Sequence, residues 1–141
     1  AGKHFVDKIR GHFGGSLKKK HIAVLGLSFK PDTDDMREAP SMAIIGELLR
    51  LGACVSAYDP VAMDNARKVL PKSVTFANDA YAAVHGADAV AVVTEWNEFR
   101  QLDLVRLARE LKGLVLFDGR NIYEPARVKS LGFMYYGVGR I

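Results

Sequence analysis

Hydrophobic and polar positions follow two alternating patterns along this chain. Short apolar runs, nearly free of polar residues, predict strands buried on both faces of a parallel sheet. These runs lie at residues 22–25, 53–58, 74–77, 87–94, 114–117 and 133–138. Between them, apolar residues at helical spacing predict helices at residues 41–51, 63–70, 78–84, 104–111 and from 125 onward. Asn78 is the expected N-cap of the third of these helices, and Asp103 that of the fourth.

Strands that alternate with helices imply right-handed crossovers and a parallel sheet. The pattern therefore predicts an α/β fold, a Rossmann-like three-layer sandwich with a sheet of about six strands and helices on both faces. The expected strand order is 3-2-1-4-5-6, that of a doubly wound sheet.

One more helix is expected at residues 3–13, before the first strand. Phe5, Val6 and Ile9 stand at helical spacing there, and glycines follow. A helix in this place indicates the tail of a linker from an upstream domain. We therefore expect residues 1–20 to be a remnant linker helix and basic turn along the outside of residues 21–141, which form the domain proper.

Length and composition indicate one ordinary globular domain. The chain has 141 residues, 49% of them hydrophobic and 26% charged. No apolar run approaches the ~20 residues that span a bilayer, so we expect no membrane contact and a cytoplasmic location. Cys54 is the single cysteine, which excludes an internal disulfide. We expect Cys54 to be a small apolar filler in a buried strand rather than a reactive thiolate.

The net charge of +4 fits a small ligand better than a nucleic acid. Binding to nucleic acid requires a larger basic stripe with interleaved aromatic residues, and the sequence has none. A phosphate-bearing small molecule needs only two or three cations. The four histidines show neither metal-ligand spacing nor a nucleophile partner, so we expect no metal site and no catalytic histidine. They are His4, His12, His21 and His85.

Polar residues gather where three of the predicted strands end, at residues 30–38, 95–97 and 118–121. Ligands of open α/β sheets lie at this edge. Lys30, Arg37 and Arg120 can therefore share one cleft suited to a diphosphate. The alternative is that Arg37 pairs with Asp34 or Asp35 and that Arg120 pairs with Asp118, in a loop that merely caps the next helix.

A dinucleotide site of the usual kind is not expected. The first strand ends in Gly26-Leu-Ser-Phe29, which lacks the Gly-x-Gly-x-x-Gly turn that admits a pyrophosphate. Asp59 stands where such a domain binds ribose. Without the glycine turn, we interpret Asp59 as a turn former before Pro60.

The longest polar segment carries a resemblance to a known family. The run Gly26-Leu-Ser-Phe-Lys-Pro-Asp-Thr-Asp-Asp-Met-Arg-Glu-Ala-Pro-Ser41 resembles the signature of the C-terminal domain of UDP-glucose 6-dehydrogenases, in the UDP-glucose/GDP-mannose dehydrogenase family. Later landmarks follow in order: Tyr58-Asp-Pro60, Ala87-Asp-Ala89 with Thr94-Glu-Trp96, and Phe117-Asp-Gly-Arg120. The form of the first motif is most similar to the UDP-glucose branch.

The resemblance implies a division of labour. An N-terminal Rossmann domain holds NAD, a long central helix makes a homodimer, and this domain holds the nucleotide-sugar. The family oxidises the sugar C6 alcohol of UDP-glucose to the carboxylate of UDP-glucuronate, with reduction of two NAD, through a cysteine thiohemiacetal. The chain is then a partner of the N-terminal and central domains of a full-length protein.

The same resemblance implies roles for individual residues. Phe29 and Lys30 would contact UDP-glucose, and Arg120 would reach its sugar end. Arg37 would reach across to NAD on the other domain. The remaining polar residues of the first motif would mainly shape the loop; they are Thr33, Asp34, Asp35 and Glu38.

One departure bears on activity. The family's nucleophilic cysteine lies in a Gly-Gly-Ser-Cys type loop, whereas here Gly14-Gly-Ser16 is followed by Leu17. We therefore expect the isolated chain to be inactive. The alternatives are a free-standing nucleotide-binding sensor, an interaction domain that has lost its site, and the same domain of a dehydrogenase for GDP-mannose or N-acetylated UDP-sugars.

Overall fold

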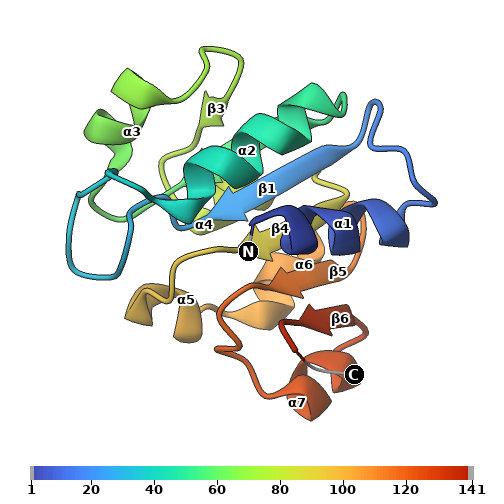
Figure 1. The fold of residues 1–141 in the computed structure, drawn as a ribbon. Coiled ribbons are helices and arrows are strands. Elements are labelled where there is room, and N and C mark those ends of the chain that lie inside the picture. The colour runs from blue at the N-terminus through green and yellow to red at the C-terminus, as the bar shows by residue number, and fades with distance from the viewer. Residues whose placement is uncertain (1, 140–141) are drawn as a thin grey trace.

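A single six-stranded parallel sheet forms the centre of the molecule (Figure 1). The computed structural model describes residues 2–139. The strands are β1 (His21–Leu25), β2 (Cys54–Tyr58), β3 (Thr75–Phe76), β4 (Ala89–Val92), β5 (Val115–Asp118) and β6 (Met134–Gly137). Their spatial order is β3-β2-β1-β4-β5-β6, and all neighbours pair in parallel. The predicted fold class and strand order are confirmed.

Seven helices connect or precede these strands among the described residues. They are α1 (Gly2–His12), α2 (Pro40–Arg50), α3 (Met63–Val69), α4 (Ala80–Val84), α5 (Asn97–Arg100), α6 (Leu104–Glu110) and α7 (Pro125–Ser130). Asp103 caps α6 as predicted, since its carboxylate accepts from the N–H of Arg106. The N-cap of α4 is Asp79 rather than Asn78, because the Asp79 carboxylate reaches the N–H of Ala82 at 2.7 Å. The sequence prediction also missed α5, whose single turn is too short to show a helical period.

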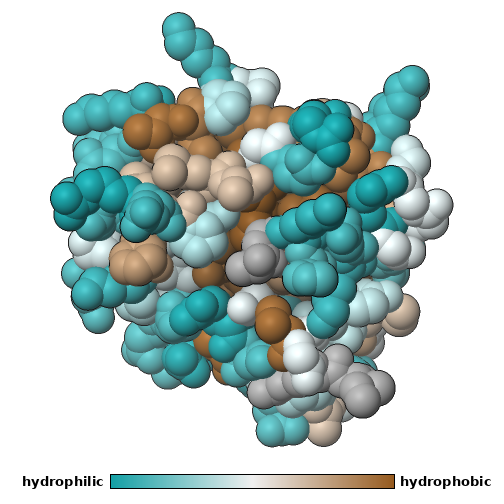
Figure 2. Space-filling view, in the orientation of Figure 1, coloured by the Kyte–Doolittle hydropathy of each residue, from teal (hydrophilic) through white to brown (hydrophobic). Residues whose placement is uncertain are grey.

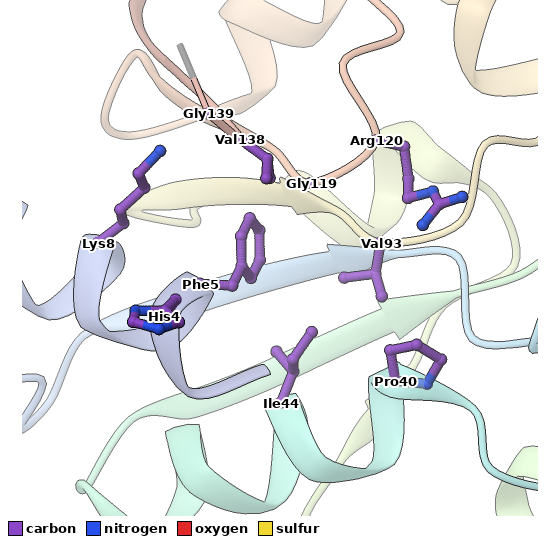
Figure 3. A pocket seen from close by; sticks show the side chains of 10 residues that line it. All are labelled: His4, Phe5, Lys8, Pro40, Ile44, Val93, Gly119, Arg120, Val138 and Gly139. Carbon is purple, nitrogen blue, oxygen red and sulfur yellow. The ribbon is translucent and has the colours of Figure 1, made fainter. Parts of the chain in front are cut away.

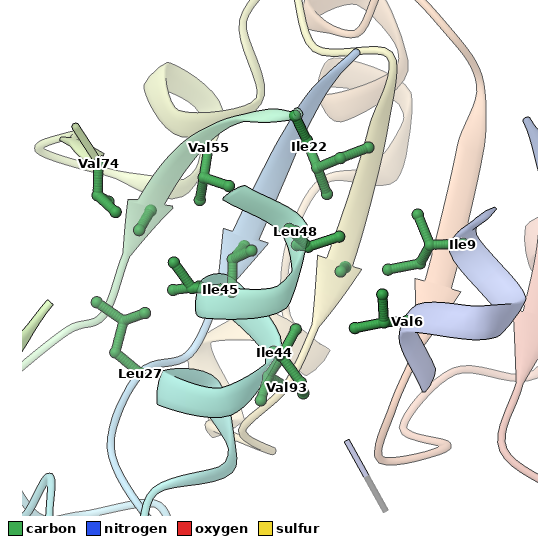
Figure 4. Close-up of a cluster of buried hydrophobic side chains, with 14 of the residues drawn as sticks. Val6, Ile9, Ile22, Leu27, Ile44, Ile45, Leu48, Val55, Val74 and Val93 are labelled. Carbon is green, nitrogen blue, oxygen red and sulfur yellow. The ribbon is translucent and has the colours of Figure 1, made fainter. Parts of the chain in front are cut away.

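Side chains alternate between the two faces of the sheet and build a hydrophobic cluster on each. In β1, Ile22 and Val24 belong to the cluster under α1, α2 and α3, whereas Ala23 and Leu25 belong to the cluster under α4, α6 and α7. Figure 4 shows the first cluster, where α2 places Ile45 and Leu48 over the strands. Because both faces are covered, β4 throughout and β1 from Ile22 to Leu25 are apolar, as the sequence indicates.

Helix α1 packs into the first cluster. Phe5, Val6 and Ile9 are buried there, and the Phe5 ring meets the Phe117 ring of β5 edge-on. At its other end, His12 Nδ1 lies 2.8 Å from the hydroxyl of Tyr136 on β6. A helix stands where the sequence predicts one, and it contributes to the hydrophobic cluster on one face of the sheet. The division between residues 1–20 and 21–141 stays a prediction.

The prediction for Cys54 is wrong. Cys54 is exposed, because β2 begins at this residue and only Val55 and the next two residues lie fully between the helices. Within residues 2–139, no helix has the length and apolar character needed to cross a membrane.

Candidate functional site

The carboxyl edge of the sheet is organised by Asp59, which follows β2 directly and is 1% exposed. Its Oδ1 accepts from the N–H groups of Val61 and Ala62, at 2.9 and 2.8 Å. Its Oδ2 accepts from the N–H groups of Leu27 and Ser28, at 2.7 and 3.0 Å. The sequence prediction of a turn former covers the first pair only. The second pair ties β2 to the loop after β1.

Trp96 completes this buried cluster from the loop after β4. Its Nε1–H lies 3.1 Å from Asp59 Oδ2 and 3.3 Å from Ser28 Oγ, and the side chain is buried. Thr94 Oγ1 donates to the Ser28 carbonyl at 2.8 Å. Loops from β1, β2 and β4 therefore meet at one point, because their strands are neighbours in the sheet.

Gly26 allows this close approach. Its φ is +94°, and a Cβ at this position would stand 2.6 Å from both the backbone nitrogen and the Cβ of Thr94. Glycine adopts positive φ without strain and leaves room for the neighbouring chain. The turn after β1 thus runs against the end of β4.

This turn does not fit the pyrophosphate of NAD. In a Rossmann domain, free N–H groups after the first strand face the phosphates. Here the N–H groups of Leu27 and Ser28 already point at the Asp59 carboxylate. A buried negative charge at this place repels a second anion. The sequence lacks the glycine-rich turn, and in the structure the N–H groups after β1 are already bonded. Both observations argue against a pyrophosphate site here.

Beyond Ser28, the loop leaves the core. The Phe29 side chain is 51% exposed and Lys30 is exposed as well. The backbone folds back on itself, since the N–H of Phe29 donates to the carbonyl of Asp35 at 2.8 Å. The two side chains predicted to contact the ligand therefore project into solvent from a fixed piece of backbone.

The predicted loop-shaping residues hold the outer part of the loop by local contacts. Thr33 Oγ1 accepts from the N–H of Asp35 at 3.2 Å, and the carbonyl of Asp34 accepts from Asn65 Nδ2 of α3 at 3.0 Å. Asp32 and Glu38 take the left-handed conformation, with φ of 63° and 54°. These turns shape the polar part of the loop, and Met36, which is buried in the first hydrophobic cluster, anchors it just before Arg37.

Arg37 pairs with Asp35, which is one of the two alternatives left open by the sequence. Its Nε and Nη2 donate to the two carboxylate oxygens at 3.0 and 2.9 Å, and its side chain is 89% exposed. Hydrogen bonds from the guanidinium and from the N–H of Arg37 lower the pKa of Asp35 from 3.8 to about 2. The same pairing raises the pKa of Arg37.

A second buried aspartate, Asp118, organises the loop after β5. Its Oδ1 accepts from the N–H groups of Arg120 and Ile122, at 3.3 and 3.1 Å. Its Oδ2 accepts from the N–H of Tyr123 at 3.0 Å and from the hydroxyl of Tyr135 at 2.8 Å. Asp118 is fully buried, so one carboxylate fixes the short loop along its whole length.

The Arg120 side chain pairs with Glu95 rather than with Asp118. Its Nη2 and Nε donate to Glu95 Oε2 at 2.7 and 3.2 Å. Burial alone would raise the pKa of Glu95, but the Arg120 hydrogen bonds, with help from a backbone N–H, lower it overall. The alternative drawn from the sequence is therefore wrong in its partner. Asp118 binds the backbone of Arg120, while Glu95, from the loop after the adjacent strand β4, binds its guanidinium.

Arg120 lines a pocket of about 470 Å³ between α1, α2 and the ends of β4 and β5. Figure 3 shows Lys8 and Arg120 on opposite sides of it, with Phe5, Ile44 and Val93 between them. Lys8 Nζ already donates to the carbonyl of Gly137. Figure 2 shows a hydrophobic strip with polar side chains on either side on the same face of the molecule.

The structure does not bring all three predicted cations into one pocket. Arg37 lines a separate pocket between its own loop and α3, with Met42, Asn65 and other residues. Lys30 lines neither of these two pockets. The expectation of a single cleft for Lys30, Arg37 and Arg120 does not hold in this structure.

The sequence reasoning missed the two residues that tie the site together. Trp96 entered only as a motif landmark, although a buried indole N–H requires an acceptor and so indicates a polar partner. The sequence predicts the local turn at Asp59 but not the hydrogen bond that its carboxylate accepts from Leu27, 32 residues earlier. In the part of the chain that the structure describes, no group of three or more potential metal-ligating side chains is present.

These features define a Rossmann-like α/β domain. At the carboxyl edge of its sheet, buried aspartates bind the N–H groups of the loops, and exposed cations lie nearby. The chain belongs to the UDP-glucose/GDP-mannose dehydrogenase family, whose UDP binding domain matches residues 23–125.

Individual relatives agree with this assignment. The chain is 47% identical over 133 residues to the UDP-glucose 6-dehydrogenase of Rhizobium meliloti (strain 1021), with 94% of this chain and 30% of that protein covered. It is 46% identical over 133 residues to the enzyme of that name from Pseudomonas aeruginosa, with coverage of 91% and 29%. The structure of a UDP-glucose dehydrogenase from Pyrobaculum islandicum superimposes with a TM-score of 0.83 at 34% identity, covering 99% of this chain and 30% of that one. This chain thus spans about 30% of the length of the relatives it matches.

Proposed function

We propose that this chain is the nucleotide-sugar-binding C-terminal part of an NAD-dependent UDP-glucose 6-dehydrogenase. The full-length protein would convert UDP-glucose to UDP-glucuronate and reduce two NAD. This chain binds UDP-glucose, and the rest of the protein holds NAD and supplies the nucleophilic cysteine. The proposal includes a homodimer and a cytoplasmic location for that protein.

One observation carries the binding role. Phe29 and Lys30 follow Ser28, and Arg120 follows Asp118, so all three extend from backbone that a buried aspartate holds. A ligand that meets pre-ordered side chains loses less entropy on binding. The aromatic ring suits a base and Lys30 suits a diphosphate, while Arg120 reaches the sugar end of the ligand.

We assign a different role to Arg37. It lies seven residues beyond Lys30, is 89% exposed, and is held only by Asp35 in its own loop. In the proposal, Arg37 does not contact UDP-glucose. It contacts NAD held by another part of the full-length protein. Thr33, Asp34, Asp35 and Glu38 shape the loop that presents it.

Calorimetry with UDP-glucose tests these roles on the chain itself. A charge-assisted contact contributes about 1.5–3 kcal/mol, which corresponds to roughly tenfold to a hundredfold in affinity. We expect Lys30→Ala and Arg120→Ala to weaken binding by that factor and Arg37→Ala to leave it nearly unchanged. Lys112→Ala is the matched control, since Lys112 is an exposed cation outside this site.

Three outcomes decide between the proposal and its rivals. Equal losses in Arg37→Ala and Lys30→Ala would mean one undivided site and a wrong role for Arg37. If Lys112→Ala lowered the affinity for UDP-glucose by the same factor, the losses would reflect net charge and not contacts in the site. Tighter binding of GDP-mannose or of an N-acetylated UDP-sugar than of UDP-glucose would assign the chain to another branch of the family.

A spectroscopic assay tests the expectation that the chain alone is inactive. With UDP-glucose and NAD present, we expect no increase in NADH absorbance, because the turn after β1 is blocked to NAD by Asp59. Cys54→Ala controls for the one thiol in the sequence. Substrate-dependent NADH formation that survives this substitution would contradict the proposal.

A further inference from the structure

We infer that Asp59 is a positioning residue for UDP-glucose binding, which acts through Ser28 to fix the backbone that presents Phe29 and Lys30. The inference rests on the proposed function of those two side chains. It assigns a role in the site to a residue that does not touch the ligand, and it includes Trp96 as the second donor to the same carboxylate.

The two oxygens of Asp59 serve different purposes. Oδ1 accepts from Val61 and Ala62, two and three residues ahead, as any aspartate at a turn does. Oδ2 accepts only from groups that are distant in sequence: Leu27 and Ser28, 32 and 31 residues back, and Trp96, 37 residues ahead. The local turn would form without any of these distant contacts. Asp59 Oδ2 therefore serves to hold the loop after β1.

Ser28 transmits this restraint to the next two residues. Its N–H and Oγ both lie within hydrogen-bond distance of Asp59 Oδ2, at 3.0 and 3.2 Å. Its Oγ also lies 2.9 Å from the carbonyl of Lys30, and its own carbonyl accepts from Thr94. Every polar group of Ser28 is thus engaged, so the peptide units on both of its sides are fixed.

Phe29 and Lys30 have no comparable support from packing. The Phe29 ring is 51% exposed, and Lys30 is exposed too. A side chain in solvent takes its direction from its backbone, because no neighbour restricts it. The direction of these two side chains depends on the backbone, which Ser28, held by Asp59, fixes on one side and the hydrogen bond from the Phe29 N–H to the Asp35 carbonyl fixes on the other.

The location of Asp59 supports the same conclusion. It follows the second strand, where a dinucleotide-binding domain carries the acidic residue that binds ribose. In this chain the carboxylate turns inward and satisfies the N–H groups that would otherwise face a phosphate. An acidic residue that recognises a ligand in one kind of site here shapes a loop for a different ligand.

The test compares three variants in two measurements. Asp59→Asn leaves one acceptor oxygen where two are needed, and Trp96→Phe removes a single donor without touching Oδ1. Asp103→Asn is the control, because it makes the same change at the N-cap of α6, away from this loop, and asparagine caps a helix as well as aspartate does. Each variant is measured by calorimetry with UDP and by amide hydrogen exchange at Phe29 and Lys30 without ligand, with thermal melts to show that it is folded.

We expect Asp59→Asn to weaken UDP binding about tenfold and to accelerate exchange at the Phe29 amide by at least the same factor. Trp96→Phe should change both in the same direction by about threefold. Asp103→Asn should change neither. Should Asp59→Asn fail to fold, Ser28→Ala takes its place, since it removes the hydroxyl contacts with Asp59 and Lys30 and keeps the Val61 turn.

The outcomes separate this inference from the function on which it rests. If the unaltered chain binds no UDP, the proposed function is wrong and the inference falls with it. If the unaltered chain binds UDP and Asp59→Asn binds it equally well, only the inference is overturned. Faster exchange together with weaker binding, in both Asp59→Asn and Trp96→Phe but not in Asp103→Asn, supports it.

Discussion

The two loops that carry the proposed ligand contacts are held in different ways. In the loop after β5, Asp118 comes from the loop's own strand and binds the N–H groups of three of the next five residues. In the loop after β1, Asp59 comes from the neighbouring strand and binds only the first two residues of a much longer segment. The first loop is fixed throughout. The second is fixed at its base by Asp59 and again by the buried Met36, whereas the Arg37 side chain beside Met36 is exposed.

This difference between the loops matches the roles proposed for their cations. Lys30 and Arg120 need a fixed direction, and Arg37 does not. Arg120 and Lys30 stand within two residues of a buried aspartate contact, but Arg37 stands nine residues beyond Ser28. A fixed base favours precise contact with a ligand held in this domain. The exposed Arg37 side chain is accessible to a group on another domain.

The largest expected effect is at the base of the longer loop. Gly26→Ala adds a Cβ at φ +94° that meets Thr94 at 2.6 Å, so we expect a loss of about 4 kcal/mol in the free energy of unfolding. Gly14→Ala is the matched control, because Gly14 also has positive φ but nothing within 4 Å of an added Cβ. Urea denaturation should show about 1 kcal/mol for the control. Equal losses would show that φ alone matters and that the base is not tightly packed.

The next largest effect concerns the shorter loop. Asp118→Ala removes the acceptor of three backbone N–H groups in a buried place, and we expect it to cost about 3 kcal/mol in urea denaturation. Asp103→Ala removes an N-cap near the surface and should cost about 1 kcal/mol. A loss for Asp118→Ala no greater than that of the control would mean that the loop does not depend on its aspartate.

The exposed part of the longer loop should separate stability from binding. Phe29→Ala should change the free energy of unfolding by less than about 0.5 kcal/mol, because the ring is 51% exposed. The same substitution should weaken UDP-glucose binding about tenfold by loss of stacking. Leu25→Ala, at a fully buried position of β1, is the contrasting variant and should cost about 3 kcal/mol. A change in stability for Phe29→Ala beyond 1 kcal/mol would mean that the tip is packed after all.

The smallest effect is at the tip. Arg37→Ala should raise the pKa of Asp35 from about 2 toward 3.8, which NMR of the carboxyl carbon measures directly. Because the pKa in the folded chain lies below its ordinary value, the ion pair supports the loop above about pH 4. That support is lost as pH falls through about 2. An Asp35 pKa that stays near 2 in Arg37→Ala would show that other contacts hold the carboxylate.

A sheet covered on both faces was predictable because β4 throughout, and β1 from Ile22 onward, are apolar at every position. Ile22 and Val24 face one hydrophobic cluster while Ala23 and Leu25 face the other, so the sequence carries the signal of a doubly covered sheet. Contacts set by local sequence were also predictable, such as the Asp103 cap. The position at which a strand becomes buried was not predictable. Cys54 is the first residue of β2 and is exposed, although the apolar run includes it.

The site was predictable only to the level of which loops meet. The adjacency of β4 and β5 places Glu95 near Arg120, but the pattern does not tell whether Arg120 pairs with Glu95 or with nearby Asp118. The reach of Asp59 to Leu27 depends on the spacing of two strands in three dimensions, and an Asp-Pro pair in the sequence indicates only a turn. Contacts between distant loops thus required the structure.

The contact between the first helix and the last strand has a consequence for synthesis on the ribosome. His12 of α1 meets Tyr136 of β6, and 124 residues separate them. At about 5–20 residues per second, the partner strand is made roughly 6–25 s after the helix. During that interval Phe5, which meets Phe117 of β5, and His12 lack these late partners, so one side of α1 stays uncovered. A nascent chain stalled before β5 should therefore bind holdase chaperones through residues 2–12, and release should follow once β6 emerges.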